Sequence, residues 1–322
     1  MLNVGIIGLG QWGRRLVESV QGKSDRVRFV AAATGTPAKA AAFAAQHGID
    51  LKSDIATLLA DPTVAAVVSS GPAGLHAAHS LAALQAGKHV LAIKPMAVRR
   101  GDAEALRDAA AKSGKLLALG YNRYFYPAVG ELRRRIADGE LGTLLHAEGN
   151  FCVDRYFKFK PGADWKTDRN QVLAGALADH MLYAMIEMFG RVAEVEAHGS
   201  TRALDIPITD TTAVLLRFRN GASGLLTAMG ATATYERLTV FGSKAWAEVR
   251  GGSRFAFQPV TGAGTEIGFP DFDAERAELE SFADAVAGVK PFPVPVDHAV
   301  HSVAVLEAIN RAASTAKPVA ID

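Results

Sequence analysis

A glycine pattern at the start of the chain constrains its fold more than any other feature. Residues 3–13 read NVGIIGLGQWG, so Gly8, Gly10 and Gly13 form G-x-G-x-x-G between an apolar run and a helical stretch. In a strand–turn–helix unit, the first glycine permits the tight turn and the second lets a pyrophosphate approach the backbone. The third lets the helix pack on the strand. Because the N–H groups at a helix start bind anions, we expect this loop to hold a dinucleotide.

Short apolar runs alternate with helical stretches over the first 120 residues. Runs that are apolar throughout are typical of strands buried on both faces. Repeated β-α-β order predicts a parallel, doubly wound sheet, and therefore an α/β domain of the Rossmann type. We expect strands at residues 3–7, 28–33, 65–69, 89–92 and 116–119, and helices at residues 13–20, 37–47, 55–59, 75–86 and 101–112.

The pattern changes near residue 121, which we take as the boundary between a dinucleotide-binding domain (1–121) and a second domain (122–322). Longer, alternating runs predict an α+β domain with a large open, mostly antiparallel sheet. Residues 219–222 (RNGA) predict a hairpin turn. A sheet with one bare face commonly packs against another subunit, so we expect a homo-dimer or homo-tetramer. We expect strands at residues 144–151, 193–200, 211–219, 222–230, 236–242 and 245–250, and helices at residues 128–136, 173–189 and 298–314.

Composition argues against several classes of function. Lys plus Arg is 35 and Asp plus Glu is 33, a net charge of +2, so no charge excess points to nucleic acid or an anionic membrane. The basic run 133–135 lies in a helical pattern and is expected to be a solvated helix face. The single cysteine, Cys152, allows no internal disulfide and no cysteine metal site. No apolar run reaches the ~18–20 residues of a membrane helix, and the N-terminus does not resemble a signal peptide. We expect a soluble cytoplasmic protein.

The second expected strand indicates which dinucleotide is preferred. A site for NAD usually carries a carboxylate about 20 residues after the glycine pattern, where it bonds the ribose 2′-hydroxyl. Thr34 stands at that position, so no carboxylate repels a 2′-phosphate. Thr36 offers a second hydroxyl, Gly35 a backbone N–H and Lys39 a charge. Thr36-Pro37 also reads as the start of a helix, which is compatible with phosphate binding. We therefore expect NADP to be preferred over NAD.

Further motifs carry a resemblance to a known family. They are Ser70-Gly71-Pro72 with His76, then residues 86–97 (AGKHVLAIKPMA), then residues 120–125 (GYNRYF). With the glycine pattern they resemble the glucose-fructose oxidoreductase, inositol dehydrogenase and MocA-like family over nearly the whole chain. The resemblance implies a Rossmann domain followed by an α+β domain, and NAD(P)-dependent oxidation or reduction of a sugar or cyclitol carbon. The residues expected to bind the cofactor are Gly8, Gly10, Gln11, Trp12, Gly13, Thr34, Gly35, Thr36, Lys39, Ser70, Gly71, Pro72, His76, Lys94 and Asn122.

One catalytic position follows from the resemblance directly. The family's Glu-Lys-Pro reads Ile93-Lys94-Pro95 here. The resemblance implies that Lys94 bonds the reacting oxygen and the nicotinamide ribose. The missing carboxylate is expected to alter the orientation and charge of that lysine. Since ligands bind at the carboxyl ends of parallel strands, a lysine at a strand end is well placed for this role.

A second catalytic motif aligns in two ways. The family's Gly-Gly-x-Leu-x-Asp-x-Gly-x-His lies at a helix start. Aligned from Gly175, it places Asp179 at the aspartate and Tyr183 at the histidine; aligned on its right side, it places His180 at the histidine. The first alignment is favoured for Asp179, and His180 stays a candidate. Oxidising a secondary alcohol requires a group that accepts the hydroxyl proton, for which His is best suited and Tyr or Lys serves if its pKa is lowered.

These observations predict an NADP-dependent oxidoreductase acting on a sugar- or cyclitol-like secondary alcohol or ketone, with no metal. Asn122 and Trp165 are expected to contact the substrate. Two alternatives stay open. Some relatives of the family use bound NAD for redox-assisted glycoside hydrolysis. The departures at Ile93 and in the Asp/His motif would also suit a dinucleotide-binding sensor without chemistry. Fold analogy does not decide between them.

Overall fold

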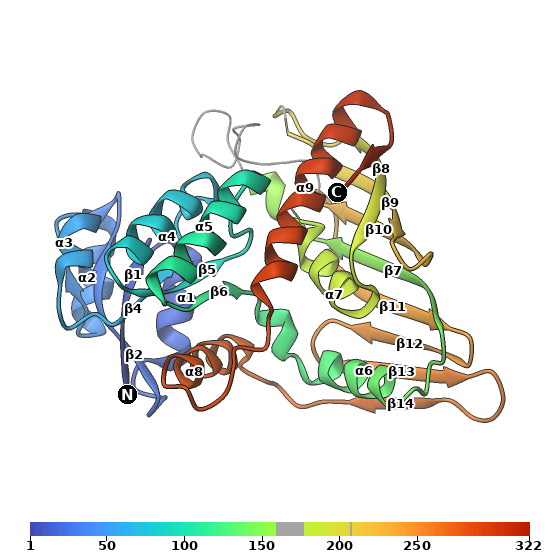
Figure 1. Ribbon diagram of the computed structural model, residues 1–322, viewed down its shortest axis with the longest axis horizontal. Coiled ribbons are helices and arrows are strands. Elements are labelled where there is room, and N and C mark those ends of the chain that lie inside the picture. Colours follow the sequence, from blue (N-terminus) through green and yellow to red (C-terminus); the bar gives the residue numbers. More distant parts are fainter. Residues whose placement is uncertain (159–176, 207) are drawn as a thin grey trace. The chain divides into compact units, whose positions relative to one another are not determined.

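The computed structural model describes residues 1–158, 177–206 and 208–322 (Figure 1). By its internal contacts the chain divides into two units: Met1–Asn122 with Asp273–Val300, and Arg123–Phe272 with His301–Asp322. The first of these boundaries lies next to the division we expected at residue 121. Asp273–Val300 group with the first unit, although they lie within the range 122–322 expected for the second domain.

The first unit is built on a parallel sheet, which has six strands in the part of the chain described, in the order β3-β2-β1-β4-β5-β6. The strand order reverses between β1 and β4, as in a doubly wound fold, and the predicted fold class is confirmed. The two-residue strand β3 was not predicted. The strands are β1 (Leu2–Ile7), β2 (Val27–Ala33), β3 (Asp50–Leu51), β4 (Ala66–Ser69), β5 (His89–Ile93) and β6 (Leu117–Gly120). The helices are α1 (Gln11–Val20), α2 (Pro37–Gln46), α3 (Ile55–Ala60), α4 (His76–Gln85) and α5 (Arg100–Ser113), with short turns η1 (Ala73–Leu75) and η2 (Asn122–Phe125).

Helix α8 (Ala274–Val286) completes this unit from far along the sequence, and it was not predicted. It packs on α1 and β2, and its Leu279 and Phe282 are fully buried in the core of the parallel sheet. Its buried face also carries Glu275 and Glu278. These carboxyl groups interrupt the apolar periodicity by which an amphipathic helix is recognised.

The second unit contains a mixed sheet, which has nine strands within the described residues, in the order β14-β13-β12-β11-β7-β10-β9-β8-β15. Neighbouring strands run antiparallel except β7 and β10. The predicted hairpin at residues 219–222 is confirmed, with Gly221 at φ +90°. The strands are β7 (Leu144–Cys152), β8 (Val192–Ser200), β9 (Thr211–Phe218), β10 (Ser223–Met229), β11 (Tyr235–Gly242), β12 (Ala245–Arg250), β13 (Arg254–Pro259), β14 (Thr265–Gly268) and β15 (Val319–Ala320); β13, β14 and β15 were not predicted.

Helix α7 (Asp179–Phe189) packs on one face of this sheet, against β7 and β10. A Cβ atom on Gly149 of β7 would lie 2.8 Å from side-chain atoms of Met181 and Met185, so glycine is required for this close approach. We expected a helix from residue 173. Of the described residues, the helix begins at Asp179, and residues 173–176 lie outside the described part. The remaining elements are α6 (Pro127–Ala137), η3 (Arg155–Lys158) and α9 (Val296–Thr315).

No helix among the described residues packs on the opposite face of the sheet. Strand alternation directs Leu215 of β9 and Leu225 of β10 outward as a direct pair, 43% and 47% exposed. Trp246 of β12 is 37% exposed on the same face. Paired charges separate these apolar side chains, among them Arg237 and Glu148 at 2.6 Å. This face therefore carries exposed apolar side chains together with charged side chains that form ion pairs with one another.

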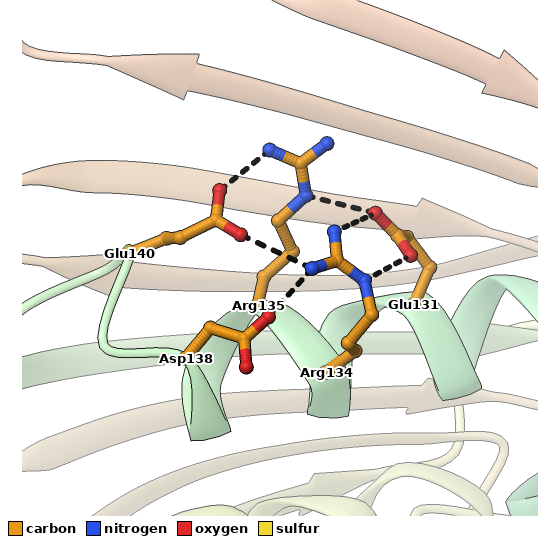
Figure 2. A network of polar contacts seen from close by, with 5 residues as sticks. All are labelled: Glu131, Arg134, Arg135, Asp138 and Glu140. Carbon is orange, nitrogen blue, oxygen red and sulfur yellow. Dashed lines mark hydrogen bonds and ion pairs between the residues drawn. The ribbon is translucent and has the colours of Figure 1, made fainter.

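Ion pairs cover the C-terminal half of α6 (Figure 2). Arg134 and Arg135 both donate to Glu131 at 2.8 Å, and they also pair with Asp138 and Glu140. The bond from Arg134 is the main reason why the pKa of Glu131 falls to about 2. The solvated face expected for the basic run is found only at Arg134, since the Arg135 side chain is 14% exposed. The two arginines are thus paired with one carboxylate of the helix and with two that follow its C-terminal end.

Candidate active site

The glycine loop between β1 and α1 is held by the loop that follows β4. Gly8 has φ +102°, and a Cβ there would lie 2.8 Å from the backbone nitrogen of Gly71. A Cβ on Gly13 would collide with the Gly8 carbonyl oxygen. Ser70 Oγ donates to that same carbonyl at 2.7 Å. Ser70 and Gly71, expected to bind the cofactor, thus also shape the loop itself.

The second glycine is different, because a Cβ on Gly10 would meet nothing within 4 Å. The first helical bond of α1 runs from the Arg14 N–H to the Gly10 carbonyl at 3.0 Å. The N–H groups of Gln11, Trp12 and Gly13 therefore have no partner in the helix ladder. Open space above unbonded amides at a helix start fits the pyrophosphate of a dinucleotide.

The turn between β2 and α2 carries the residues expected to select the dinucleotide. Gly35, Thr36 and Lys39 are exposed and Thr34 is half-buried. Thr36 occupies the N-cap position of α2, but its side chain makes no capping bond. Pro37 has no N–H and the Lys39 N–H donates to the Thr36 carbonyl at 3.1 Å, so among the first three positions of this helix the Ala38 N–H is the donor left for another acceptor.

Arg14 is a residue that sequence reasoning missed at this turn. Its Nη2 donates to the Lys39 carbonyl at 2.6 Å, and its Cζ lies 5.0 Å from the centre of the Phe43 ring. These contacts bring a second cation to the turn. The signal in the sequence was weak, because Arg14 and Lys39 are 25 residues apart.

His76 joins two loops at the carboxyl edge of the parallel sheet. Its ring nitrogens lie 2.8 Å from the carbonyl oxygens of Gly71, after β4, and Pro95, after β5. The side chain is 3% exposed, and burial is the main cause that lowers its pKa. His76 was expected to bind the cofactor. In the structure its ring contacts two backbone carbonyl groups, one in the loop after β4 and one in the loop that carries Lys94. The adjoining Pro72 is the N-cap residue of η1.

Lys94 follows β5, and its N–H donates to the Gly120 carbonyl at 3.2 Å. The peptide bond to Pro95 is cis. Ile93, which replaces the family's glutamate, is 8% exposed and belongs to the apolar core. Since the carboxyl ends of parallel strands share one edge, β5 brings Lys94 to the same edge as the glycine loop after β1.

Helix α8 reaches the end of β6 through a carboxylate that sequence reasoning missed. Asn122 Nδ2 donates to Glu275 Oε1 at 3.2 Å, and Arg15 Nε pairs with the same oxygen at 2.7 Å. The Arg15 guanidinium also lies over the Trp12 ring, 5.4 Å from its centre. Asn122 is 7% exposed, so its amide is positioned by α8.

The second catalytic motif lies in the other unit, at the start of α7. Asp179 is 3% exposed and Tyr183, one turn later, is fully buried. Burial is the first cause that raises the pKa of Tyr183 above its ordinary value, followed by the nearby Glu187. His180 is half-buried and accepts a hydrogen bond from Arg123, 2.8 Å away. Trp165, the expected substrate contact, lies outside the described residues.

Among the residues that the structure describes, no group of three His, Cys, Asp or Glu side chains could hold a metal ion. In the same residues, no helix has both the length and the apolar character needed to cross a membrane.

Comparison with known proteins agrees with this geometry. Residues 2–121 match the family described as "Oxidoreductase family, NAD-binding Rossmann fold", and residues 129–248 match "GFO/IDH/MocA C-terminal domain". The scyllo-inositol 2-dehydrogenase (NAD(+)) of Bacillus subtilis (strain 168) is 26% identical over 324 residues, 92% of this chain and 90% of that protein. A 1-carboxy-3-chloro-3,4-dihydroxycyclo hexa-1,5-diene dehydrogenase of Comamonas testosteroni is 27% identical over 236 residues, 71% of this chain but only 58% of that longer protein.

Solved structures show the same fold. The WlbA dehydrogenase of Bordetella pertussis, in complex with NADH and UDP-GlcNAcA, superposes with a TM-score of 0.90 at 22% identity, over 100% of this chain and 98% of that one. An oxidoreductase from Desulfitobacterium hafniense DCB-2, described as NADPH-dependent, gives a TM-score of 0.91 at 21% identity, over 99% and 97%. Both domains of the family follow one another along the sequence, and the chain belongs to the GFO/IDH/MocA family of oxidoreductases.

Proposed function

We propose that the protein is an NADP-preferring oxidoreductase that transfers a hydride to or from a secondary alcohol or ketone carbon of a sugar- or cyclitol-like substrate. The observation that carries this proposal is the open space over Gly10 at the start of α1, on the sheet edge that also bears Lys94. Relatives named for inositol support the substrate class.

The preference for NADP rests on the turn after β2. A 2′-phosphate there would meet the hydroxyls of Thr34 and Thr36 and two cations, Arg14 and Lys39, with no carboxylate at position 34. A charge-assisted hydrogen bond contributes about 1.5–3 kcal/mol, which corresponds to roughly tenfold to a hundredfold in affinity.

Fluorescence titration with NADPH and NADH tests this preference. We expect NADPH to bind roughly tenfold to a hundredfold more tightly. Arg14→Met should weaken NADPH binding and leave NADH binding nearly unchanged, and Thr34→Asp should reverse the preference. Arg28→Met, which removes an arginine of β2 bonded to Asn3, is the matched control. Equal or tighter binding of NADH by the wild type would end this proposal.

When bound, the nicotinamide supplies the hydride acceptor or donor. We propose that Lys94 holds the reacting oxygen and that the His76 clamp fixes the loop from which Lys94 projects. Asp179 and His180 are the candidates for handling the hydroxyl proton. Tyr183 is the weaker candidate, because burial raises its pKa and keeps its hydroxyl protonated.

Turnover of a panel of sugars and polyols with NADP, followed by nicotinamide absorbance, tests the chemistry. Lys94→Ala should lower turnover by about 10²–10⁴ while leaving NADPH binding nearly intact. A severe effect of Asp179→Asn with a mild effect of His180→Asn supports the first alignment of the motif, and the reverse supports the second. Release of sugar without net absorbance change would indicate glycoside hydrolysis, and binding without turnover would indicate a sensor.

We also propose that the outward face of the mixed sheet joins copies of the chain into a homo-dimer or homo-tetramer. Leu215 and Leu225 form an exposed apolar pair on its neighbouring strands β9 and β10. The proposed location is the cytoplasm, where the single cysteine, the buried Cys152, stays reduced.

A further inference from the structure

Four side chains from separate segments of the second unit form one cluster around His180. Arg123 Nε and Nη2 donate to the two oxygens of Glu236, at 2.7 and 3.0 Å. The remaining terminal nitrogen of Arg123, Nη1, lies 2.8 Å from His180 Nδ1. The Phe151 ring stacks on the His180 ring, with the two ring centres 4.1 Å apart. The Arg123 guanidinium carbon lies 4.7 Å from the centre of the same phenyl ring.

The sheet register explains why these groups meet. Phe151 of β7 and Glu236 of β11 are direct partners across the sheet, so their side chains lie on the same face. Arg123 spans both of them from η2, and α7 brings His180 over Phe151. The side chains of Arg123 and Glu236 are 13% and 19% exposed, so this ion pair is well shielded from water. A bidentate pair fixes the plane of the guanidinium as well as its position.

The contact with Arg123 determines where His180 carries its proton. A guanidinium has only donors, so His180 Nδ1 must accept and has to keep its lone pair. A neutral imidazole with a bare Nδ1 has its proton on Nε2. A doubly protonated ring would place an N–H group against the Arg123 N–H and a second positive charge beside the first.

Among the described residues, the side chains around His180 include one carboxylate whose charge Arg123 already balances. From β7 the facing side chain is the uncharged Phe151, and from β11 it is Glu236, whose two oxygens are both engaged by Arg123. The ring centre of Tyr126 lies 5.8 Å from the guanidinium carbon of Arg123. On α7 itself, Asp179 precedes His180 and points about 100° away around the helix.

We propose that Arg123, oriented by Glu236, is a positioning residue that keeps His180 neutral with its proton on Nε2. Through Nε2, His180 is then a hydrogen-bond donor and not a proton acceptor. In alcohol oxidation the hydride goes to the cofactor and the hydroxyl proton goes to another group, for which Asp179 is the remaining candidate of the two proposed above. His180 keeps its Nε2 proton throughout. This catalytic consequence rests on the proposed function, whereas the protonation state does not.

Imidazole NMR of the ¹⁵N-histidine-labelled full chain tests the protonation state without turnover. The chain has nine histidines, and His180→Gln identifies the signals of this one. In the wild type we expect a bare Nδ1 and a protonated Nε2 from about pH 5 to about pH 8. In Arg123→Met the ring should titrate within this range, towards the ordinary histidine pKa of about 6.5. Arg123→Lys, which retains a cationic donor, should restore part of the wild-type behaviour.

Arg237→Met is the matched control, because it removes an arginine from the same sheet whose partner, Glu148, is equally close at 2.6 Å. Arg237 follows Glu236 on β11, so its side chain lies on the opposite face from His180. This variant should leave the His180 signals unchanged. If circular dichroism shows that Arg123→Met does not fold, Glu236→Gln repeats the test with the arginine retained. In Glu236→Gln we expect the His180 ring to titrate in part.

The pH profile of kcat/KM provides the second readout. In the wild type this profile should show no inflection caused by His180. In Arg123→Met it should gain an inflection near pH 6.5, below which kcat/KM changes about tenfold per pH unit. A wild-type His180 that carries its proton on Nδ1, or becomes doubly protonated between pH 5 and 8, would overturn the proposal. So would wild-type signals in both Arg123→Met and Glu236→Gln. If no substrate is turned over, the proposed function fails while the NMR result still decides the role of Arg123.

Discussion

Glu187 of α7 should make the second unit lose stability as the pH rises through neutrality. Its side chain is 17% exposed, and its nearest cation, Arg133, is 3.6 Å away and itself lies over the Tyr124 ring. Glu187 Oε2 is buried without a hydrogen-bond partner in the part of the chain described. Burial outweighs the attraction of Arg133 and raises the pKa of Glu187 to about 7. The neutral carboxyl is thus the form that the folded state prefers.

The sign and size of the effect follow from linkage. A carboxyl whose folded pKa lies above its unfolded value contributes stability that is fully present below the unfolded pKa of 4.5 and is lost as the pH rises through about 7. Since one pKa unit corresponds to about 1.4 kcal/mol, the upper limit of the loss is about 3 kcal/mol. For a unit of this size, 1 kcal/mol corresponds to about 2–4 °C in melting temperature.

Glu187→Gln tests this reasoning, because the amide is similar in size and stays neutral. Urea unfolding and thermal melting, followed by circular dichroism, should show wild type and variant equally stable near pH 4.5. Near pH 8 the variant should be more stable, by about 1–3 kcal/mol. Glu266→Gln, at an exposed position of β14, should show no such pH-dependent difference. A Glu187→Gln variant less stable than the wild type at pH 8 would mean that the pair with Arg133 outweighs the cost of burial.

Two further predictions concern binding and assembly. Gly10→Ala should leave the melting temperature unchanged, because its Cβ meets nothing within 4 Å, and it should weaken NADPH binding at least about tenfold in a fluorescence titration. Gly13→Ala should also lower the melting temperature, since its Cβ would collide with the Gly8 carbonyl oxygen, so equal melting temperatures for the two variants would contradict the loop geometry. Leu225→Glu should reduce the molar mass measured by light scattering, whereas Val289→Glu, at an exposed apolar position of the first unit, should not. A monomeric wild type at micromolar concentration would refute the proposed assembly.

Local patterns were sufficient to predict much of this fold. The strands β1, β2, β4, β5 and β6 lie within one or two residues of their expected ranges, because buried parallel strands form continuous apolar runs. The glycine loop was predictable because each glycine meets a local steric demand, such as the positive φ of Gly8. The hairpin at residues 219–222 followed from its Asn-Gly pair.

Features that depend on distant partners were not predictable. Nothing local indicates that Arg14 reaches Lys39, that Glu275 meets Asn122, or that Arg123 meets His180 across 57 residues of sequence. The basic run on α6 was misjudged for the same reason, since Arg133 is covered by Tyr124 and Glu187. Sequence patterns give the face on which a side chain lies, but not the group that a second segment brings to it.

The late return of α8 has a consequence for how the protein is made. A ribosome releases β1 to β6 long before Leu279 and Phe282, which close the core of the parallel sheet. Until then, the nascent first unit exposes the apolar surface on α1 and β2 that α8 covers, so its final folding is delayed until the whole second sheet from β7 to β14 has been synthesised. A fragment of residues 1–122 alone should aggregate, and a fragment that joins residues 1–122 to residues 273–300 through a short linker should not.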